Sequence, residues 1–105
     1  MPIASKDVGL DQLERKAAEA AGLLKLLANE NRLLILCRLA LAGETSVSAL
    51  TAAVDLSQSA LSQHLAKMRE EGLLATRRQG HTIFYRIADA NAARLLQSLK
   101  GIFCP

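Results

Sequence analysis

The chain has 105 residues, half of them hydrophobic, and a formal net charge of +3. This length fits one domain, and the apolar fraction is enough to bury a core. With no tryptophan, one tyrosine and two phenylalanines, the composition favours helices packed on helices over a β-sandwich. The N-terminus lacks the apolar run of a signal peptide, and no stretch is long enough to span a bilayer. We therefore expect a cytoplasmic protein that has no membrane partner.

The positive charge is concentrated in one part of the chain. Residues 57–86 carry five basic and two acidic side chains, while residues 1–56 have a net charge of −1 and residues 87–105 one of +1. A polyanion would approach the protein at the basic segment. A charged stretch is also common on an ordinary solvated surface, so this feature needs support from the motifs.

Two helices are predicted before residue 43. Residues 1–9 are expected to form a flexible arm, and residues 10–28 carry an apolar stripe at helical spacing. Residues 30–42 are apolar nearly all round, which is typical of a central helix. Asn29 is expected to cap this second helix and Gly43 to end it.

A helix-turn-helix pattern follows. Ser46 can cap a short helix over residues 47–54, which is expected to be buried through Val47, Leu50 and Val54. A tight turn leads to a fourth helix, which Ser57 is expected to cap and which runs to Glu71 and stops at Gly72. Two short helices joined in this way, the second polar on its outer face, are typical of DNA-binding proteins.

The fourth helix carries short hydrogen-bonding side chains opposite its apolar residues Leu61, Leu65 and Met68. These side chains are Gln58, Ser59, Ser62 and Gln63. Serine and glutamine can donate and accept hydrogen bonds at base edges in a major groove. A merely soluble helix face is the alternative, and the helix-turn-helix context favours base contact. His64 lies on the flank and either reaches a phosphate or packs locally, whereas Lys67 is expected at a phosphate.

After Gly72 the apolar period changes from helical to alternating, which predicts a β-hairpin. Gln79-Gly80 is expected to form its two-residue turn, so that Leu74 faces Tyr85 and Thr76 faces Ile83 on the buried side. Phe84 and Tyr85 fit the core of this hairpin better than a stacking platform.

Basic side chains gather towards the turn of the hairpin. Arg77, Arg78 and His81 are expected near the tip, at phosphates or in the minor groove. There they would contribute affinity and salt dependence more than sequence choice.

Asp89 is expected to cap a last helix that runs to Phe103. The resulting fold is mainly α with a β-hairpin wing, a winged helix-turn-helix of order α-α-α-α-β-β-α over residues 10–105. The first and last helices carry more apolar residues than a core of this size needs. They predict a homodimer, since DNA readers of this kind bind two half-sites of an inverted repeat through two-fold symmetry.

The sequence resembles the ArsR (arsenic-repressor) family of winged-helix regulators over nearly its whole length. The matching segments are Leu-Leu-Ala-Asn-Glu-Asn-Arg-Leu-Leu-Ile-Leu-Cys at 26–37, Leu-Ser-Gln-Ser-Ala-Leu-Ser-Gln-His-Leu-Ala-Lys-Met-Arg at 56–69 and Arg-Arg-Gln-Gly-His-Thr-Ile-Phe-Tyr at 77–85. The resemblance implies a homodimeric repressor that leaves its operator when an inducer acts on it.

Many members of that family sense metals, but this chain lacks the ligands they use. Residues 46–54 contain no cysteine, and residues 89–103 offer Asp89 without a histidine. His64 and His81 have no third ligand near them in the predicted fold, and zinc or a soft metal would require a thiolate and imidazole cluster. We expect neither a metal nor a cofactor.

Cys37 and Cys104 are the two cysteines of the chain. An isolated cysteine on an apolar helix, such as Cys37, is most often an inert core residue, whereas Cys104 near the terminus should be accessible. Their positions are similar to those in the sulfide- and persulfide-responsive branch of the family, the BigR, SqrR and YgaV-like regulators. That resemblance implies that reactive sulfur or another oxidant joins the two thiols and releases the DNA.

Three alternatives stay open. The first is a regulator of the same type with structural cysteines and a different inducer, although a cytoplasmic chain argues for reduced thiols. The second is a thiol enzyme, which is disfavoured because the chain has no Cys-x-x-Cys motif and no phosphate-binding glycine loop. The third is a winged-helix module that binds only proteins. We expect no enzymatic activity.

Overall fold

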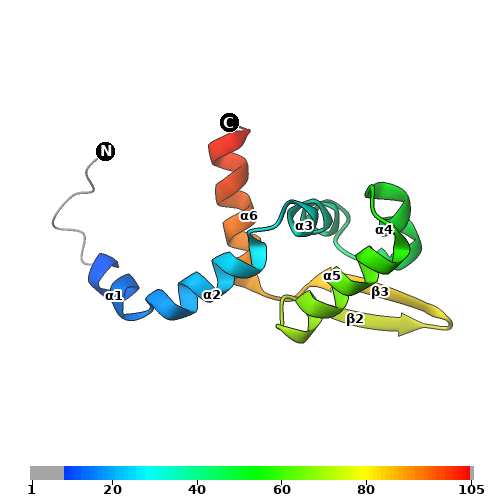
Figure 1. The fold of residues 1–105 in the computed structure, drawn as a ribbon, viewed down its shortest axis with the longest axis horizontal. Helices are drawn as coiled ribbons and strands as arrows, with labels where there is room; N and C mark the ends of the chain where they lie inside the picture. Colours follow the sequence, from blue (N-terminus) through cyan, green and yellow to red (C-terminus); the bar gives the residue numbers. More distant parts are fainter. Residues whose placement is uncertain (1–8, 105) are drawn as a thin grey trace.

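The computed structural model describes residues 9–104 (Figure 1). The elements in chain order are α1 (Gly9–Arg15), α2 (Ala17–Leu27), α3 (Glu30–Ala42), β1 (Thr45–Ser46), α4 (Val47–Ala53), α5 (Gln58–Glu70), β2 (Leu74–Gln79), β3 (Thr82–Ile87) and α6 (Ala90–Phe103). The prediction of a mainly helical protein with a β-hairpin wing is confirmed. Residues 1–8 of the predicted arm lie outside the described residues, and Gly9 already belongs to α1. None of the helices within residues 9–104 has the length and apolar character needed to cross a bilayer.

The four predicted helix caps are present. The side chain of Asn29 accepts a hydrogen bond from the Arg32 amide at the start of α3, and Ser46 and Ser57 do the same for Ala49 and Ala60 in α4 and α5. Asp89 accepts from the amides of Asn91 and Ala92 at the start of α6. These bonds satisfy amides that have no partner inside the helix, which explains why each helix begins where the sequence predicts.

Two elements differ from the prediction. The expected first helix is two helices, α1 and α2, separated at Lys16, whose ψ of 13° departs from helical geometry. No glycine or proline causes this break, but α1 buries no side chain, so packing within the protomer does not hold it in line with α2. The short strand β1 was not predicted, because a strand of two residues gives no alternating pattern.

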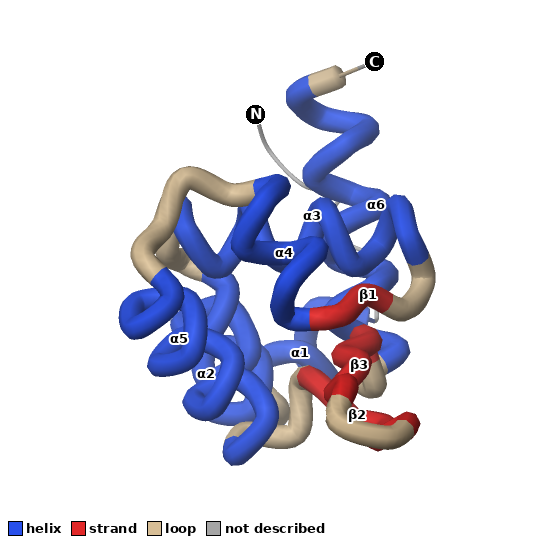
Figure 2. Tube along the Cα trace, turned by 90° about the vertical axis from the view of Figure 1, so that its right-hand side faces the viewer, coloured by secondary structure: helices blue, strands red, loops and turns tan. Residues whose placement is uncertain are grey.

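The strands form one antiparallel sheet in the order β1-β3-β2, grouped on one side of the molecule (Figure 2). The predicted hairpin register was wrong by two residues: Leu74 lies opposite Ile87, and Thr76 lies opposite Tyr85. The turn is Gly80-His81, with a φ of 63° at Gly80, as in turns that place glycine first. A shift of two residues keeps every side chain on its predicted face of the sheet.

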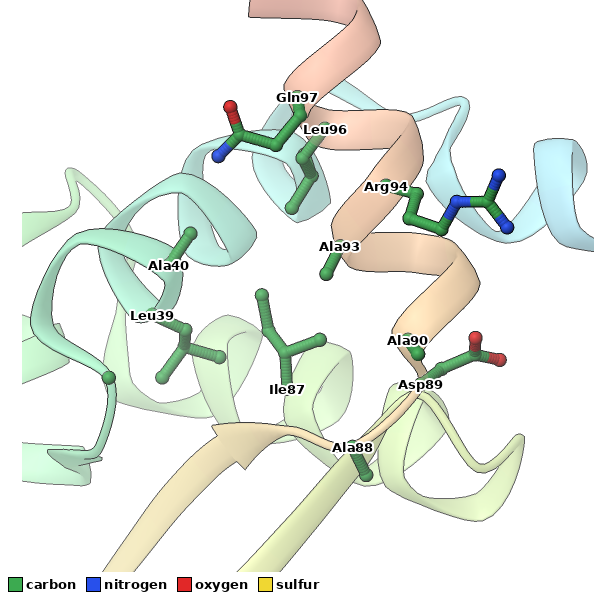
Figure 3. Close-up of a pocket in the computed structure, with 11 residues that line it drawn as sticks. Leu39, Ala40, Ile87, Ala88, Asp89, Ala90, Ala93, Arg94, Leu96 and Gln97 are labelled. Atoms are coloured by element: carbon green, nitrogen blue, oxygen red, sulfur yellow. The ribbon is translucent and has the colours of Figure 1, made fainter.

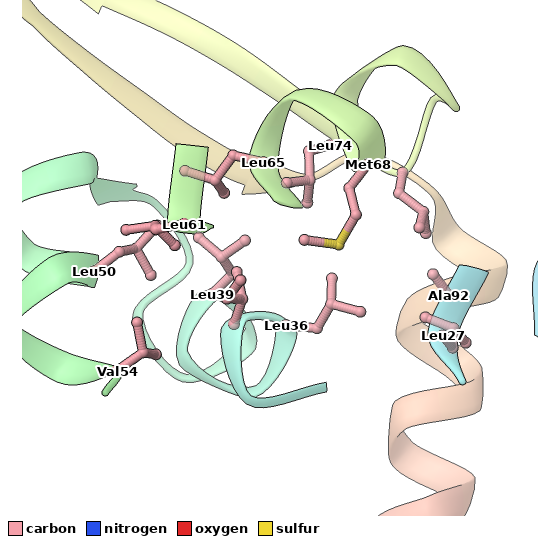
Figure 4. Packing of buried hydrophobic residues seen from close by; sticks show 12 residues of the cluster. Leu27, Leu36, Leu39, Leu50, Val54, Leu61, Leu65, Met68, Leu74 and Ala92 are labelled. Atoms are coloured by element: carbon pink, nitrogen blue, oxygen red, sulfur yellow. The ribbon is translucent and has the colours of Figure 1, made fainter. Parts of the chain in front are cut away.

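The core lies between α3, α5 and the start of the wing (Figure 4). Ile35, Leu36 and Leu39 of α3 are completely buried, which confirms that α3 is the central helix. Leu61, Leu65 and Met68 of α5 pack against it, as predicted. Leu50 of α4 and Val54, directly after its last residue, are buried, but Val47 is only half-buried, which corrects the prediction for Val47.

The molecule is elongated, with principal extents of 53 × 28 × 21 Å. The wing projects from one end, α1 lies at the other, and α6 rises away from the body (Figure 1). This arrangement leaves large apolar side chains exposed on α1 and at the end of α6, among them Leu13, Ile102 and Phe103.

Candidate nucleic-acid interface

The outer face of α5 is polar because its apolar side chains are all turned inwards. Leu61, Leu65 and Met68 are at most 1% exposed, so residues on the opposite side of the helix face solvent. The side chains on that side are Gln58, Ser59, Ser62 and Gln63, and all four are exposed. The structure thus confirms that these short hydrogen-bonding groups share the exposed side of α5.

Two further predicted contacts lie on the flank of α5. His64 is half-buried, and Lys67 is exposed and forms an ion pair of 3.1 Å with Glu71. An exposed pair one helical turn apart contributes little to stability, so Lys67 remains free to exchange Glu71 for a phosphate.

The three basic residues predicted at the wing tip occupy two different places. His81 is in the turn, and Arg78 lies opposite Ile83 two residues from Gly80; both side chains are exposed. Arg77 lies on the other face of the hairpin, because successive side chains of a strand alternate. Its side chain does not extend towards the tip, since it is bonded to Glu44.

Arg77 is held by three neighbouring side chains. Its Nε donates to Oε1 and Oε2 of Glu44 at 3.2 and 3.1 Å, and its Nη2 donates to Oε1 at 2.7 Å. Its Nη1 donates to Gln79 at 3.0 Å, and the guanidinium lies 4.7 Å from the centre of the Phe84 ring.

The charge of Arg77 affects the ionisation of Glu44. The hydrogen bonds from Arg77 lower the pKa of Glu44 below its usual 4.5, and the charges of Arg77 and Arg86 act in the same direction. The same bonds raise the pKa of Arg77. Both groups therefore stay charged at neutral pH.

Glu44 is the residue of this region that the sequence did not reveal. It follows the glycine that ends α3 and lies 33 positions before Arg77, so no local spacing links the two. Only the return of β3 between β1 and β2 brings them together.

The two thiols are free and exposed, and they are not brought together. Cys37 lies in the middle of α3, whereas Cys104 directly follows the last residue of α6. The exposure of Cys37 excludes the inert core cysteine that an apolar helix suggested.

An open groove of about 550 Å³ separates α3 from α6 (Figure 3). Ala40 of α3 and Gln97 of α6 lie on its two sides. From Gln97 the helix continues for another seven residues to Cys104, which is about 10 Å further along its axis. A disulfide requires Cα atoms within about 7 Å, and the two cysteines are not near each other, so joining them within one protomer requires part of the chain to move.

Comparison with known proteins identifies the family. A model described as "Bacterial regulatory protein, arsR family" matches residues 29–76, which span α3 to the start of the wing. The biofilm growth-associated repressor of Agrobacterium fabrum is 46% identical over 103 residues, covering 98% of this chain and 87% of that protein. The chain belongs to the arsR family.

Two further relatives place this arsR-family regulator more closely. The transcriptional activator HlyU of Vibrio cholerae is 43% identical over 97 residues, covering 92% of this chain and 89% of that protein. The crystal structure of the transcriptional repressor BigR from Xylella fastidiosa matches with a TM-score of 0.84 and 42% identity, covering 90% of this chain and 96% of that one. The chain is thus a DNA-binding transcriptional regulator with a winged-helix fold, in the BigR-like branch of the family.

The described part of this regulator holds no cluster suited to a metal. Within residues 9–104, no three histidine, cysteine, aspartate or glutamate side chains come close enough to hold an ion. His64 lies on α5 and His81 in the turn of the wing, whereas Cys37 lies on α3 and Cys104 directly follows α6. The four side chains therefore come from four different elements of the fold.

Proposed function

We propose that this regulator is a cytoplasmic homodimeric repressor that binds an inverted-repeat operator and releases it when Cys37 and Cys104 are joined by reactive sulfur. The observation that supports DNA binding is the exposed polar face of α5, which lies opposite the buried apolar face of the same helix. The wing that follows α5 in the chain is basic. Gln58, Ser59, Ser62 and Gln63 would contact base edges, and His64, Lys67, Arg78 and His81 would contact the backbone or the minor groove. Arg77 lies on the other face of the wing hairpin, where it is bonded to Glu44.

The dimer follows from the apolar residues that one protomer leaves uncovered. Leu13 of α1 is 51% exposed, Leu24 of α2 is 54% exposed, and Phe103 of α6 is 76% exposed. Exposed large apolar side chains on the first and last helices support an interface with a second copy, because such side chains gain free energy when another apolar surface covers them. In a two-fold dimer that reads an inverted repeat, the two copies of α5 must lie about one helical turn of DNA apart, near 34–36 Å.

The proposed signal is an organic persulfide. The Cys37 thiolate attacks the outer sulfur of the persulfide, which leaves a persulfide on Cys37 and releases the organic thiol. Cys104 then attacks the Sγ atom of Cys37, and the outer sulfur leaves as hydrogen sulfide. The two cysteines are oxidised to a disulfide and lose two hydrogens, while the persulfide sulfur is reduced. If a second organic persulfide first converts Cys104 to its own persulfide, the outer sulfur on Cys37 attacks Sγ of Cys104, hydrogen sulfide leaves, and a trisulfide bridge forms.

Because the two thiols are separated in this structure, a covalent link between them would change the conformation of the protein. That change would be the signal. A movement of the end of α6 that brings Cys104 to α3 would displace the surface on which the dimer is built. A small change there alters the spacing of the two α5 helices, and groove geometry tolerates little change.

The test compares wild type with Cys37→Ser before and after treatment with glutathione persulfide. Both reduced proteins should bind operator DNA with the same affinity, and only wild type should lose binding after treatment. Intact mass after alkylation should show that wild type has lost two hydrogens or gained whole sulfur atoms, with neither cysteine alkylated. Cys104→Ser is the matched control and should behave like Cys37→Ser.

A second candidate function is favoured by the same separation of the thiols: a regulator of this family whose cysteines have no sensing role and whose inducer is different. Its signature would be two normally alkylated cysteines and unchanged DNA affinity after persulfide treatment. The opposite result, with loss of binding in wild type alone, would exclude it.

A further inference from the structure

We propose that Glu44 is a positioning residue for DNA binding, and that Arg77 acts with it as a clasp that sets the direction of the wing. The inference rests on the DNA-binding part of the proposed function. In this proposal Arg77 orients the wing, and Arg78 and His81 are the wing residues that contact the DNA.

The clasp crosses all three strands of the sheet. Arg77 is in the edge strand β2, its partner Phe84 is in the central strand β3, and Ser46 of β1 lies opposite Phe84 on the other side. Glu44 immediately precedes β1. The charge of Arg86 in β3 also lowers the pKa of Glu44. The guanidinium of Arg77 passes over the Phe84 ring and reaches Glu44 at the far edge. One side chain thus ties the wing to the loop that follows α3.

The bonding geometry suits orientation more than strength. Both partners are partly exposed, with side-chain exposures of 49% for Arg77 and 32% for Glu44, so the ion pair by itself contributes little stability. A guanidinium bonded through two of its nitrogens to one carboxylate, and through the third to Gln79, has a fixed direction.

The wing needs such a device because its support is short. β1 offers only two residues for pairing, and beyond them the hairpin is a two-stranded ribbon. Such a ribbon is only marginally ordered in water and has a large twist. Arg77 lies three residues before Gly80, so the tip extends about 10 Å beyond the clasp. A small rotation at the clasp therefore moves Arg78 and His81 relative to α5.

The competing interpretation is that Arg77 binds a phosphate directly. A simple effect of charge is a further alternative, in which Glu44 only repels DNA and Arg77 only attracts it. Glu44→Gln and Arg77→Gln change the net charge in opposite directions, so charge alone would move their affinities in opposite directions. A clasp predicts that both substitutions weaken binding, because each breaks the same pair.

The experiment measures binding of the full chain to a fluorescein-labelled 30-base-pair duplex of mixed sequence, by anisotropy, between 50 and 200 mM KCl. Glu44→Gln and Arg77→Gln should each weaken binding by roughly three- to tenfold, the size of coupling within one hydrogen-bond network. The exchanged pair Glu44→Arg/Arg77→Glu keeps the net charge and should return to within about twofold of wild type. The salt dependence of these variants should equal that of wild type.

Two control variants calibrate the measurement. Arg94→Gln removes one positive charge from α6, outside the wing, and should change affinity little. Arg78→Gln should reduce the slope of log K against log salt by about 0.9, as expected for one lost phosphate contact.

Three results would overturn the clasp. They are tighter binding by Glu44→Gln, an exchanged pair as weak as Arg77→Gln, and a salt slope for Arg77→Gln reduced like that of Arg78→Gln. If a single variant fails to fold by circular dichroism, the exchanged pair alone decides. If wild type shows no salt-dependent binding, the proposed function fails; if wild type binds and the variants equal it, only the clasp fails.

Discussion

The helices α5 and α6 have nearly the same length, 13 and 14 residues, yet they expose opposite kinds of surface. α5 turns its three large apolar residues into the core and presents serine and glutamine to solvent. In α6 the only completely buried residue is Ala92, and the last turn leaves Ile102 and Phe103 exposed. Both helices begin with a side-chain cap, so the difference lies in packing and not in helix formation.

The exposed surfaces of α5 and α6 therefore suit different partners. The apolar face of α5 is packed within one protomer. Its free face carries hydrogen-bonding groups that can pair with the donors and acceptors of base edges. The end of α6 exposes Ile102 and Phe103, and this apolar surface gains free energy only when another apolar surface covers it. One helix is therefore suited to DNA and the other to a second protein chain.

The largest expected effect comes from placing a charge on the free face of α6. Phe103→Asp should convert the proposed homodimer to a monomer in size-exclusion chromatography with light scattering. Affinity for an operator selected from random DNA should fall by roughly a hundredfold or more, because the second half-site no longer binds as part of the same molecule. Gln97→Asp, at an exposed polar residue about 120° around α6 from Phe103, is the control. A dimeric Phe103→Asp protein would contradict the contrast drawn for α6.

The next effect concerns the buried face of α5. Leu61→Ala should lower the free energy of unfolding by about 2–5 kcal/mol, since it leaves a cavity in the core. Urea unfolding followed by circular dichroism measures this change. Leu41→Ala, at a residue that is 81% exposed, should change it by less than about 0.5 kcal/mol. Equal effects of the two substitutions would show that α5 is not packed as described.

The smallest effect concerns the polar face of α5. Gln63→Ala should weaken operator binding by about 1–3 kcal/mol, the range for a side chain that reads one base. Its affinity for a mixed-sequence duplex should stay nearly unchanged, because that affinity comes from phosphate contacts. Gln97→Ala makes the same chemical change on α6 and should alter neither. A loss of affinity for both duplexes would assign Gln63 to the backbone and not to a base.

Helix boundaries were predictable because their causes are local. Asn29, Ser46, Ser57 and Asp89 each accept a hydrogen bond from an amide two or three residues later, and this interaction depends only on nearby sequence. Gly43 and Gly72, with φ of 81° and 82°, end α3 and α5 for an equally local reason. The buried residues of α5 were predictable because their spacing reports one face of a helix.

The hairpin marks the limit of local reasoning. The sequence Gln-Gly-His allows glycine to be the first or the second residue of the turn, and each choice gives a different register. Both registers bury the same side chains, so the apolar pattern cannot choose between them. The observed pairing, with Thr45 and Ser46 of β1 also bonded to β3, is a property of the whole sheet.

The sequence by itself determined α3 to α6, the two hairpin strands, the helix caps, the core face of α5 and the family, because each of these depends on spacing within one segment. It did not determine the break at Lys16 or the two-residue strand β1. The tertiary structure decided which distant side chains meet. It placed Glu44 on Arg77 across three strands, and it left Cys37 and Cys104 on separate helices. The physical reason is that contacts between distant segments depend on how strands and helices are packed, and no local period in the sequence records that packing.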